Sequence, residues 1–250
     1  MQNYELISNW GDGIYKDKNK ALKLFRNKPY EYVIEKARIQ SIVYNAGLPV
    51  PAVYGVKKIN ENEIVMEMDY IKGEPLIYEN MDIEKRTEAL KTLARLQSMI
   101  NAVDAVDFGL PKYSTHIISE IKRTPYLSAK AKDKVFDLFY RLYKEKSNLC
   151  HGDFHPNNVL FDGEKHWIID WDGAGTGEPV ADACIAYFYE YRFMPSIAGI
   201  YVQEYCKHAG IKQEAFLAWR PIAAAYHVNI KTKEERDYIL NIINEDICCF

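Results

Sequence analysis

Short apolar runs broken by single charges distinguish the amino-terminal part of this chain from the rest. Residues 21–25 (ALKLF) form a β-prone run with one charge, Lys23, at its centre. After a break at Pro29, residues 30–46 carry apolar positions at helical spacing, and residues 63–69 (EIVMEMD) form another β-prone run. The pattern therefore predicts strands and one helix in this part of the chain.

The remainder of the chain is dominated by helical periodicity. The segments that carry it are residues 83–100, 129–143, 179–193, 197–219 and the segment that follows residue 232. Asp82 and Ser128 stand where N-caps are expected, and residues 232–235 (TKEE) form a capping box. No internal repeat indicates a solenoid. These residues predict a mostly helical carboxy-terminal part.

Between the helical segments, residues 151–158 (HGDFHPNN) are followed by two short β-prone runs, residues 159–161 and 166–169. An Asp-Gly pair between the two runs is a strong turn signal, so the runs predict a β-hairpin. The second run returns toward the start of the first. Asp170 at its end is therefore expected beside Asn158, although the two are twelve residues apart.

Three side chains of this segment have the chemistry that phosphoryl transfer needs. That reaction uses a carboxylate at the acceptor hydroxyl, together with an amide oxygen and a second carboxylate that hold Mg²⁺ against the phosphates of ATP or GTP. Asp153, Asn158 and Asp170 supply these groups at a fitting spacing. Hard oxygen ligands of this kind favour Mg²⁺ over zinc.

The HGDFHPNN motif, followed by IIDWD at residues 168–172 and GEPVAD at residues 177–182, resembles the aminoglycoside phosphotransferase and choline kinase superfamily. Members of this superfamily are small-molecule kinases with a protein-kinase-like fold. The resemblance implies an α+β fold of two lobes. Residues 1–70 would form a nucleotide-binding lobe with a small antiparallel sheet and one helix. Residues 71–250 would form a mostly helical lobe with the catalytic loop, the metal site and the acceptor pocket.

The same resemblance assigns roles to individual residues. Asp153 would be the catalytic base, Asn158 and Asp170 the metal ligands, and Asp182 a helix residue that ties down the catalytic loop. The implied reaction moves the γ-phosphoryl group of ATP or GTP to a hydroxyl group of a small molecule.

A kinase-like fold also needs a strand lysine for the α- and β-phosphates and a helix glutamate that holds this lysine in place. Lys23 is the candidate lysine, and Glu35 in the predicted helix is its best partner, with Glu31 as the second choice. The alternatives are a lysine on an edge strand and a glutamate on a solvated helix face.

Two further segments are candidates for nucleotide contacts. Gly11 and Gly13 could free backbone amides for a phosphate, although the chain lacks a full glycine-rich motif and the same residues suit a plain hairpin turn. Met66, Glu67 and Met68 lie where the resemblance places the hinge that meets the nucleotide base. Methionine at these positions is equally suited to core packing.

Acceptor selection depends on the carboxy-terminal part, where acidic and aromatic residues are frequent. If they faced a cleft, they would favour a cationic acceptor, such as an aminoglycoside or an amino alcohol, through carboxylates and cation–π contacts. The alternative is that most of the rings belong to the core. The residues concerned are Asp172, Glu178, Glu190, Tyr187, Tyr189, Tyr191, Trp171 and Trp219.

Composition narrows the remaining possibilities. The chain has 250 residues, of which 48% are hydrophobic, and its net charge of −3 gives no support for nucleic acid or an anionic membrane as a partner. A cytoplasmic location is expected, since neither a signal-peptide pattern nor an apolar run of the ~18 residues that a membrane span needs is present. The 5 cysteines form no C-x-x-C pair and indicate neither a disulfide framework nor a zinc site.

Two alternative functions remain open. His151, Asp153 and His155 at alternating positions, with Asp170 and Asp172 nearby, could form a metal site that activates water for hydrolysis. This alternative leaves Lys23, Glu35 and Asn158 unexplained. A kinase-fold protein could also bind nucleotide without turnover. The competent residues at the catalytic positions argue against that function, and the weak glycine pattern argues slightly for it.

Overall fold

The computed structural model describes residues 4–9, 11–77, 80–229 and 232–247. The chain forms two compact units. The sheet unit comprises Met1–Tyr78 and Pro156–Asp172, and the helical unit comprises Glu79–His155 and Gly173–Phe250. The HGDFHPNN segment therefore begins in the helical unit and ends in the sheet unit. The functional division into residues 1–70 and 71–250 stays a prediction.

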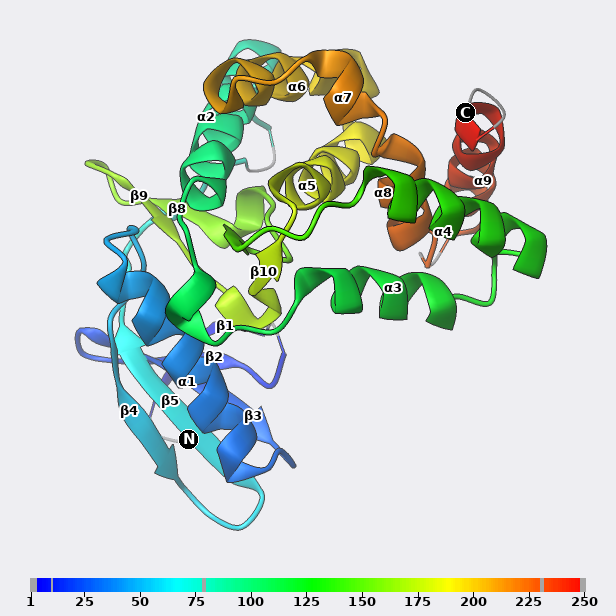
Figure 1. Cartoon of the computed structure of the whole chain (residues 1–250). Helices are drawn as coiled ribbons and strands as arrows, with labels where there is room; N and C mark the ends of the chain where they lie inside the picture. Colours follow the sequence, from blue (N-terminus) through cyan, green and yellow to red (C-terminus); the bar gives the residue numbers. More distant parts are fainter. Residues whose placement is uncertain (1–3, 10, 78–79, 230–231, 248–250) are drawn as a thin grey trace. The chain divides into compact units, whose positions relative to one another are not determined.

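The sheet unit contains a five-stranded antiparallel sheet in the order β1-β2-β3-β5-β4 (Figure 1). Its strands are β1 (Glu5–Ser8), β2 (Ile14–Asp17), β3 (Lys20–Arg26), β4 (Val53–Lys58) and β5 (Glu63–Asp69). Helix α1 (Tyr30–Asn45) packs against this sheet. Its Val33 and Ala37 form a buried cluster with Phe25, Ile64 and Met66 of the strands. This cluster is the core that holds α1 to the sheet.

Strand alternation explains which side chains reach α1. Successive side chains of a strand point to opposite faces, so Phe25 and Met66 face α1, whereas Leu22 and Leu24 belong to a separate cluster. The β3–β5 register pairs Lys23 with Met66, which puts Lys23 on the α1 side of the sheet. The strands predicted at residues 21–25 and 63–69 and the helix predicted at residues 30–46 are confirmed.

A smaller sheet completes the sheet unit. Its strands are β6 (Glu74–Pro75), β8 (Val159–Phe161) and β9 (His166–Ile168), in the order β6-β8-β9. Asp162 organises the turn between β8 and β9, because its carboxylate accepts hydrogen bonds from the backbone N–H groups of Glu164 at 2.8 Å and Lys165 at 2.9 Å. The predicted hairpin is therefore confirmed.

The helical unit surrounds a central apolar helix, α5 (Pro179–Phe193), whose residues Ala181–Phe188 are all buried (Figure 1). The other helices are α2 (Ile83–Asn101), α3 (Tyr113–Arg123), α4 (Ala129–Leu142), α6 (Pro195–Ala209), α7 (Gln213–Leu217), α8 (Arg220–His227) and α9 (Lys233–Ile247). Gly210 adopts a left-handed φ of 67° and separates α6 from α7, so the segment predicted as helical at residues 197–219 is interrupted.

The predicted N-caps act as expected. The Asp82 carboxylate accepts from the N–H of Lys85, and the Ser128 hydroxyl accepts from the N–H of Ala131. In the capping box of α9, the N–H of Glu235 donates to the hydroxyl oxygen of Thr232 at 3.4 Å.

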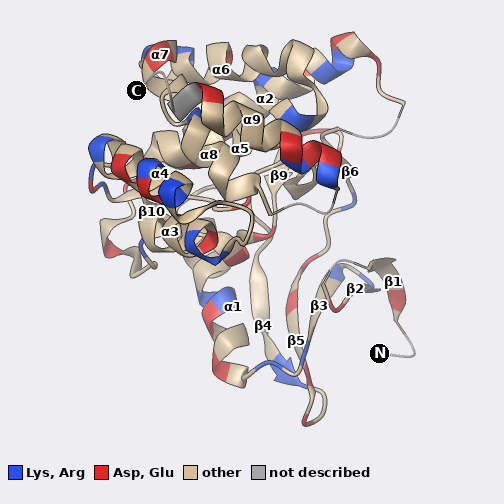
Figure 2. Cartoon of the chain, turned by 90° about the vertical axis from the view of Figure 1, so that its right-hand side faces the viewer, with Lys and Arg blue, Asp and Glu red and all other residues tan. Residues whose placement is uncertain are grey.

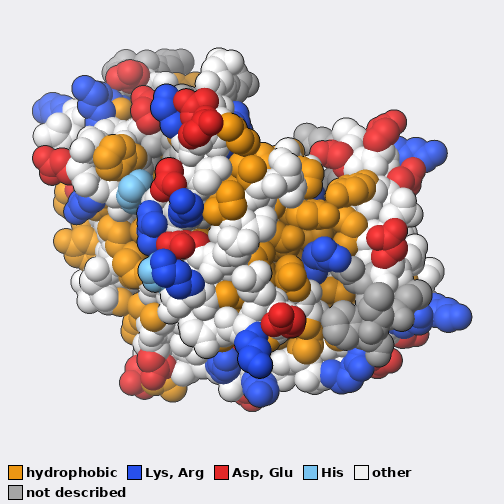
Figure 3. Space-filling model, turned by 90° about the horizontal axis from the view of Figure 1, so that it is seen from above, with side chains coloured by type: hydrophobic (Ala, Val, Ile, Leu, Met, Phe, Trp, Pro, Cys, Tyr) orange, Lys and Arg blue, Asp and Glu red, His pale blue; other side chains and the backbone are white. Residues whose placement is uncertain are grey.

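Charged residues lie on the outer helices of this unit, and α3 and α4 carry many of them (Figure 2). Positive and negative side chains are interspersed with apolar ones on the face in Figure 3, in keeping with the net charge of −3. Of the helices formed by the described residues, none is long and apolar enough to cross a membrane.

A two-stranded sheet of β7 (Asn148–Cys150) and β10 (Gly175–Gly177) precedes α5 and leads into the candidate site.

Candidate active site

The first half of the HGDFHPNN segment is fixed by a buried carboxylate of α5. Asp182 is 2% exposed, and its two oxygens accept hydrogen bonds from the backbone N–H groups of His151 and Gly152, both at 3.0 Å. Gln97 and Asn101 of α2 donate to the same carboxylate at 2.6 and 3.1 Å. Burial raises the pKa of Asp182, and these hydrogen bonds oppose that shift. Asp182 thus ties down the loop, as the resemblance implies.

A close approach of two glycines shapes the same loop. Gly152 has a φ of 82°, a left-handed conformation, and a Cβ atom added there would collide with the carbonyl oxygen of Gly173. The loop that carries Asp153 can therefore pack only if residue 152 is glycine. Sequence reasoning did not single out this glycine, because the contact joins segments that are distant along the chain.

Asp153 presents its carboxylate to solvent, with a side chain that is 64% exposed. Nε2 of His155 lies 3.8 Å from its Oδ2, and the His155 ring stacks on Tyr189 at a centroid distance of 4.9 Å. His151 is fully buried, and its Nδ1 accepts from the N–H of Asp153 at 3.3 Å. The two histidines therefore pack and orient the loop, and the exposed carboxylate of the segment belongs to Asp153.

The predicted metal ligands lie at one end of the β8–β9 hairpin. Asn158 directly precedes β8, and its carbonyl oxygen accepts from the N–H of Ile169 at 2.9 Å. Asp170 follows at a left-handed φ of 62°, which turns the chain just after the strand. The side-chain oxygens of Asn158 and Asp170 are hard donors held by one hairpin, so this donor set fits Mg²⁺.

The described residues contain no group of three or more His, Cys, Asp or Glu side chains that could hold a metal ion. The alternative cluster built on His151, Asp153 and His155 is not such a group.

Lys23 reaches the hairpin from β3. Its Nζ lies 2.8 Å from Oδ1 of Asp170 and 3.0 Å from Oδ2 of Asp172, and its side chain is 19% exposed. Burial lowers the pKa of Lys23, but the two carboxylates more than offset this and raise it above its ordinary value. The candidate phosphate lysine and a candidate metal ligand are thus in direct contact within the sheet unit.

Lys23 and Glu35 are expected to form an ion pair, but in the structure Lys23 contacts Asp170 and Asp172, and Glu35 contacts Arg38. Glu35 is exposed on α1 and binds Arg38, with Oε1 2.7 Å from Nη2 and Oε2 2.8 Å from Nε. Side chains three residues apart share one helix face, and Glu35 finds its partner there. The neighbouring Lys36 points elsewhere, and its Nζ donates to the carbonyl oxygen of Asp172 at 2.5 Å.

The turn between β1 and β2 contains both candidate glycines. Gly11 and Gly13 adopt positive φ values of 60° and 109°. Asp12 between them accepts from the N–H of Arg26 at 2.7 Å, so its carboxylate is turned toward the end of β3. Trp10 lies outside the described residues. The glycine conformations suit both a hairpin turn and exposed amides, and a phosphate contact here stays a prediction.

The hinge assignment of Met66, Glu67 and Met68 stays a prediction, and the sheet limits the contacts that these residues could make. All three belong to β5, a central strand whose backbone pairs with β3 on one side and β4 on the other. Met66 is 1% exposed within the core, and Glu67 binds Lys57 at 2.7 Å. Two ladders occupy the backbone of a central strand, so a contact of these residues with a nucleotide base would come from their side chains.

Most of the acidic and aromatic residues considered for the acceptor are interior. Glu178 is 4% exposed and binds Lys146 at 2.8 Å, and Glu190 is 2% exposed. Burial raises the pKa of Glu190 to about 8. Tyr187 and Trp219 are buried in the core of the helical unit. The predicted acidic and aromatic cleft is therefore wrong for these four residues and for Trp171, which is 2% exposed, because their side chains lie in the interior.

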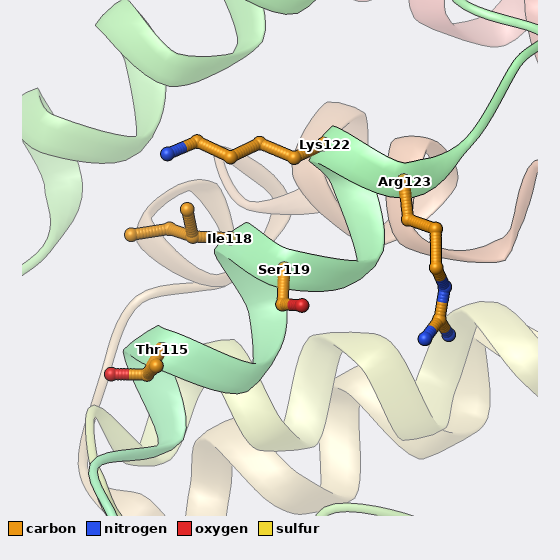
Figure 4. A pocket seen from close by; sticks show the side chains of 5 residues that line it. All are labelled: Thr115, Ile118, Ser119, Lys122 and Arg123. Carbon is orange, nitrogen blue, oxygen red and sulfur yellow. The ribbon is translucent and has the colours of Figure 1, made fainter.

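An open pocket lies along α3 and is lined by Thr115, Ile118, Ser119, Lys122 and Arg123 (Figure 4). The candidate catalytic and metal residues do not line it. This pocket is therefore not part of the candidate active site.

Several solved structures share this fold, among them an amicoumacin kinase and a choline kinase. An amicoumacin kinase in complex with AMP-PNP, Ca²⁺ and Ami has a TM-score of 0.70 and 12% sequence identity, and the comparison covers 99% of this chain and 89% of that one. Choline kinase LicA from Streptococcus pneumoniae has a TM-score of 0.64 and 17% identity, covering 99% of this chain and 94% of that one. The fold is thus the protein-kinase-like, two-lobe α+β fold.

A curated relative and a family model give the relationship in sequence. Acyl-CoA dehydrogenase family member 10 of Mus musculus is 27% identical over 209 residues, which covers 72% of this chain and 19% of that protein. The chain therefore spans about a fifth of that relative's length. The model of the phosphotransferase enzyme family, APH, matches residues 14–222, which is most of the chain. The chain belongs to the phosphotransferase enzyme family.

Proposed function

We propose that this protein is a kinase that moves the γ-phosphoryl group of ATP, or of GTP, to a hydroxyl group of a small molecule. Its family supports the reaction class. The observation that carries the proposal is the convergence of Lys23 with Asp170 and Asp172, at 2.8 and 3.0 Å, within the sheet unit. A lysine beside a metal-binding carboxylate is the arrangement that holds nucleotide phosphates in kinases.

Lys23 is suited to bind the phosphates because it stays positively charged. Its two carboxylate partners raise its pKa, so the ammonium persists at neutral pH. Gly11 and Gly13, at positive φ, would add backbone amides to the phosphate contacts. Since β5 is paired on both sides, backbone contacts with the nucleotide base would come from residues beyond Asp69, where the strand ends.

Asn158 and Asp170 would hold Mg²⁺, since both place hard oxygen donors at one end of the β8–β9 hairpin. When bound there, Mg²⁺ neutralises the charge of the phosphates. The hairpin holds both ligands through its own backbone pairing and turn. The left-handed conformation of Asp170 then directs its carboxylate toward Lys23 instead of along the strand.

Asp153 is the proposed base that accepts the proton of the acceptor hydroxyl. Its exposed carboxylate is accessible to an acceptor, and the loop behind it is fixed by Asp182 through the amides of His151 and Gly152. Positioning of this kind accounts for most catalysis of phosphoryl transfer, because little covalent work is left to the protein.

The proposed acceptor carries a cationic group, as an aminoglycoside or an amino alcohol does. A cationic acceptor is supported by the similar choline kinase, whose name indicates that it acts on choline, and by two side chains of this protein. The Asp153 carboxylate offers negative charge, and Tyr189 beside it is only partly buried and could contact a cation through its ring. The buried Glu178 and Glu190 do not contribute to this support.

The test is acceptor-dependent release of ADP or GDP by the purified protein in the presence of Mg²⁺. The acceptors are aminoglycosides, choline, ethanolamine, other amino alcohols and neutral sugars, and Asp153→Asn is the control. The proposal predicts that at least one amine-containing acceptor stimulates release and that the variant loses the stimulation. Stimulation by neutral sugars alone would retain the kinase and overturn the cationic acceptor.

Nucleotide binding without release for any acceptor would instead favour a kinase-fold protein that binds nucleotide without turnover. Equilibrium binding of a fluorescent ATP analogue separates this outcome from a failure to bind nucleotide at all.

A further inference from the structure

Lys23 needs a carboxylate partner in addition to Asp170, the proposed metal ligand. Under the proposed function, Asp170 binds Mg²⁺, and a carboxylate that coordinates a cation has less charge left to hold a lysine. Protein kinases meet this need with a glutamate of the helix that packs on the sheet. In this chain the candidate, Glu35, binds Arg38 of its own helix instead.

Asp172 is the second carboxylate that contacts Lys23. Its Oδ2 lies 3.0 Å from Nζ of Lys23, close to the 2.8 Å of the Asp170 contact. The left-handed φ of 62° at Asp170 and the short 3₁₀ helix at Trp171–Gly173 bring the two carboxylates to the same ammonium group. Trp171 between them is 2% exposed and donates from Nε1 to the carbonyl oxygen of Ile168 at 3.1 Å, which fixes this turn.

Helix α1 reaches the same turn through a cation. Nζ of Lys36 donates to the carbonyl oxygen of Asp172 at 2.5 Å. Lys36 follows Glu35 by one residue, which rotates its side chain by about 100° around the helix. The face of α1 toward the hairpin therefore presents a lysine, and it contacts Asp172, not Lys23.

We propose that Asp172 is the positioning residue that anchors Lys23 for nucleotide phosphates, and that Lys36 of α1 fixes the backbone of Asp172. The inference rests on the proposed function. In protein kinases a helix glutamate holds the lysine. In this protein the carboxylate that holds Lys23 would come from the residues after the β8–β9 hairpin, and α1 would supply the cation that holds the backbone of Asp172. Lys23 thereby keeps one carboxylate partner when Asp170 binds the metal.

The test is a double-mutant cycle on the affinity for a fluorescent ATP analogue, using Lys23→Met, Asp172→Asn and the combined variant. The inference predicts that Asp172→Asn weakens binding about tenfold, equivalent to ~1.4 kcal/mol, and that the combined variant is no weaker than Lys23→Met. Asp172→Glu should recover part of the affinity. Glu35→Gln is the matched control, an α1 carboxylate that contacts Arg38, and should leave the affinity unchanged.

The dependence of turnover on Mg²⁺ separates an anchor from a metal ligand. Asp172→Asn should raise the KM for nucleotide and leave the Mg²⁺ concentration for half-maximal activity unchanged, whereas Asp170→Asn should raise that concentration. Additive effects of Lys23→Met and Asp172→Asn on affinity would overturn the inference, as would a Mg²⁺ requirement raised equally by both aspartate variants.

A second double-mutant cycle measures the interaction between Lys23 and Asp172 in the absence of nucleotide. The same Lys23 and Asp172 variants are compared by urea unfolding of the unliganded protein, and a coupling between the two substitutions is expected. If the wild type binds no nucleotide, the proposed function fails while this coupling still reports the ion pair. Absence of coupling in the unliganded protein overturns the anchor itself.

Discussion

Nζ of Lys23 lies 2.8 Å from Oδ1 of Asp170, although the two residues are 147 positions apart in the chain. The contact joins the third strand of the amino-terminal sheet to the end of the β8–β9 hairpin, and both belong to one compact unit. It brings the proposed phosphate-binding lysine to a proposed metal ligand. The proposed chemistry therefore depends on a hairpin that lies far along the chain from the sheet.

Replacing Lys23 with methionine should weaken nucleotide binding roughly 10- to 100-fold, because a charged hydrogen bond is worth ~1.5–3 kcal/mol. Binding of a fluorescent ATP analogue measures this. Lys20→Met is the matched control: Lys20 belongs to the same strand but binds Glu67, at 3.3 Å. Equal losses in the two variants would show that the effect is general to the strand and not specific to the phosphate site.

Asp182→Asn should destabilise the fold by roughly 2–4 kcal/mol. The new side-chain NH₂ group would face hydrogen-bond donors, which in the wild type all donate to the buried carboxylate. Urea unfolding measures the change, with Asp237→Asn on the exposed side of α9 as the control. The variant should also lose turnover, since the loop amides that precede Asp153 would lose their acceptor. A variant as stable as the wild type would contradict the role of Asp182.

Gly152→Ala should destabilise the protein more than Gly163→Ala does. Both glycines adopt a left-handed φ, 82° and 100°, so both substitutions incur backbone strain of roughly 1 kcal/mol. Only Gly152 also faces a backbone collision, with the carbonyl oxygen of Gly173, whereas the space around Gly163 is open. Comparable melting temperatures for the two variants would contradict the close packing of the two glycine segments.

Several of these features follow from local sequence patterns. The hairpin at residues 159–168 has a strong turn and two short β-prone runs, so its geometry is predictable, including the pairing of Asn158 with Ile169, the residue before Asp170. Lys23 is recognisable as the single charge of a buried strand. In each case the pattern within a few residues determines the structure.

Other features depend on long-range packing that no local pattern contains. Glu35 and Lys36 are adjacent, and the rotational setting of α1 on the sheet decides which of them faces the hairpin. The central position of the strand that contains Met66 depends on β3 and β4, which flank it and lie elsewhere in the sequence. The burial of Glu190 likewise depends on how α5 is surrounded by other helices.

The stability of the protein should depend on pH through Glu190. Burial raises its pKa from 4.5 to about 8 in the folded state, so its contribution is fully favourable below pH 4.5 and is lost as the pH rises through the folded pKa. The loss is roughly 1.4 kcal/mol for each unit of pKa difference.

Glu190→Gln removes this titration. The variant should gain stability relative to the wild type as the pH rises from 5 to about 8. Urea unfolding at several pH values measures the gain, and Glu61→Gln on the exposed β4–β5 turn is the control. A difference between variant and wild type that stays constant with pH would contradict the raised pKa.

The central claim, phosphoryl transfer with Asp153 as base, is tested most directly by comparing nucleotide affinity with turnover in Asp153→Asn. Affinity is measured with a fluorescent ATP analogue, and turnover as acceptor-stimulated release of ADP in the presence of Mg²⁺. We predict affinity close to that of the wild type and a loss of turnover of at least roughly 100-fold, the lower range for general base catalysis. Turnover retained in the variant, or affinity and turnover lost to the same extent, would contradict this role for Asp153.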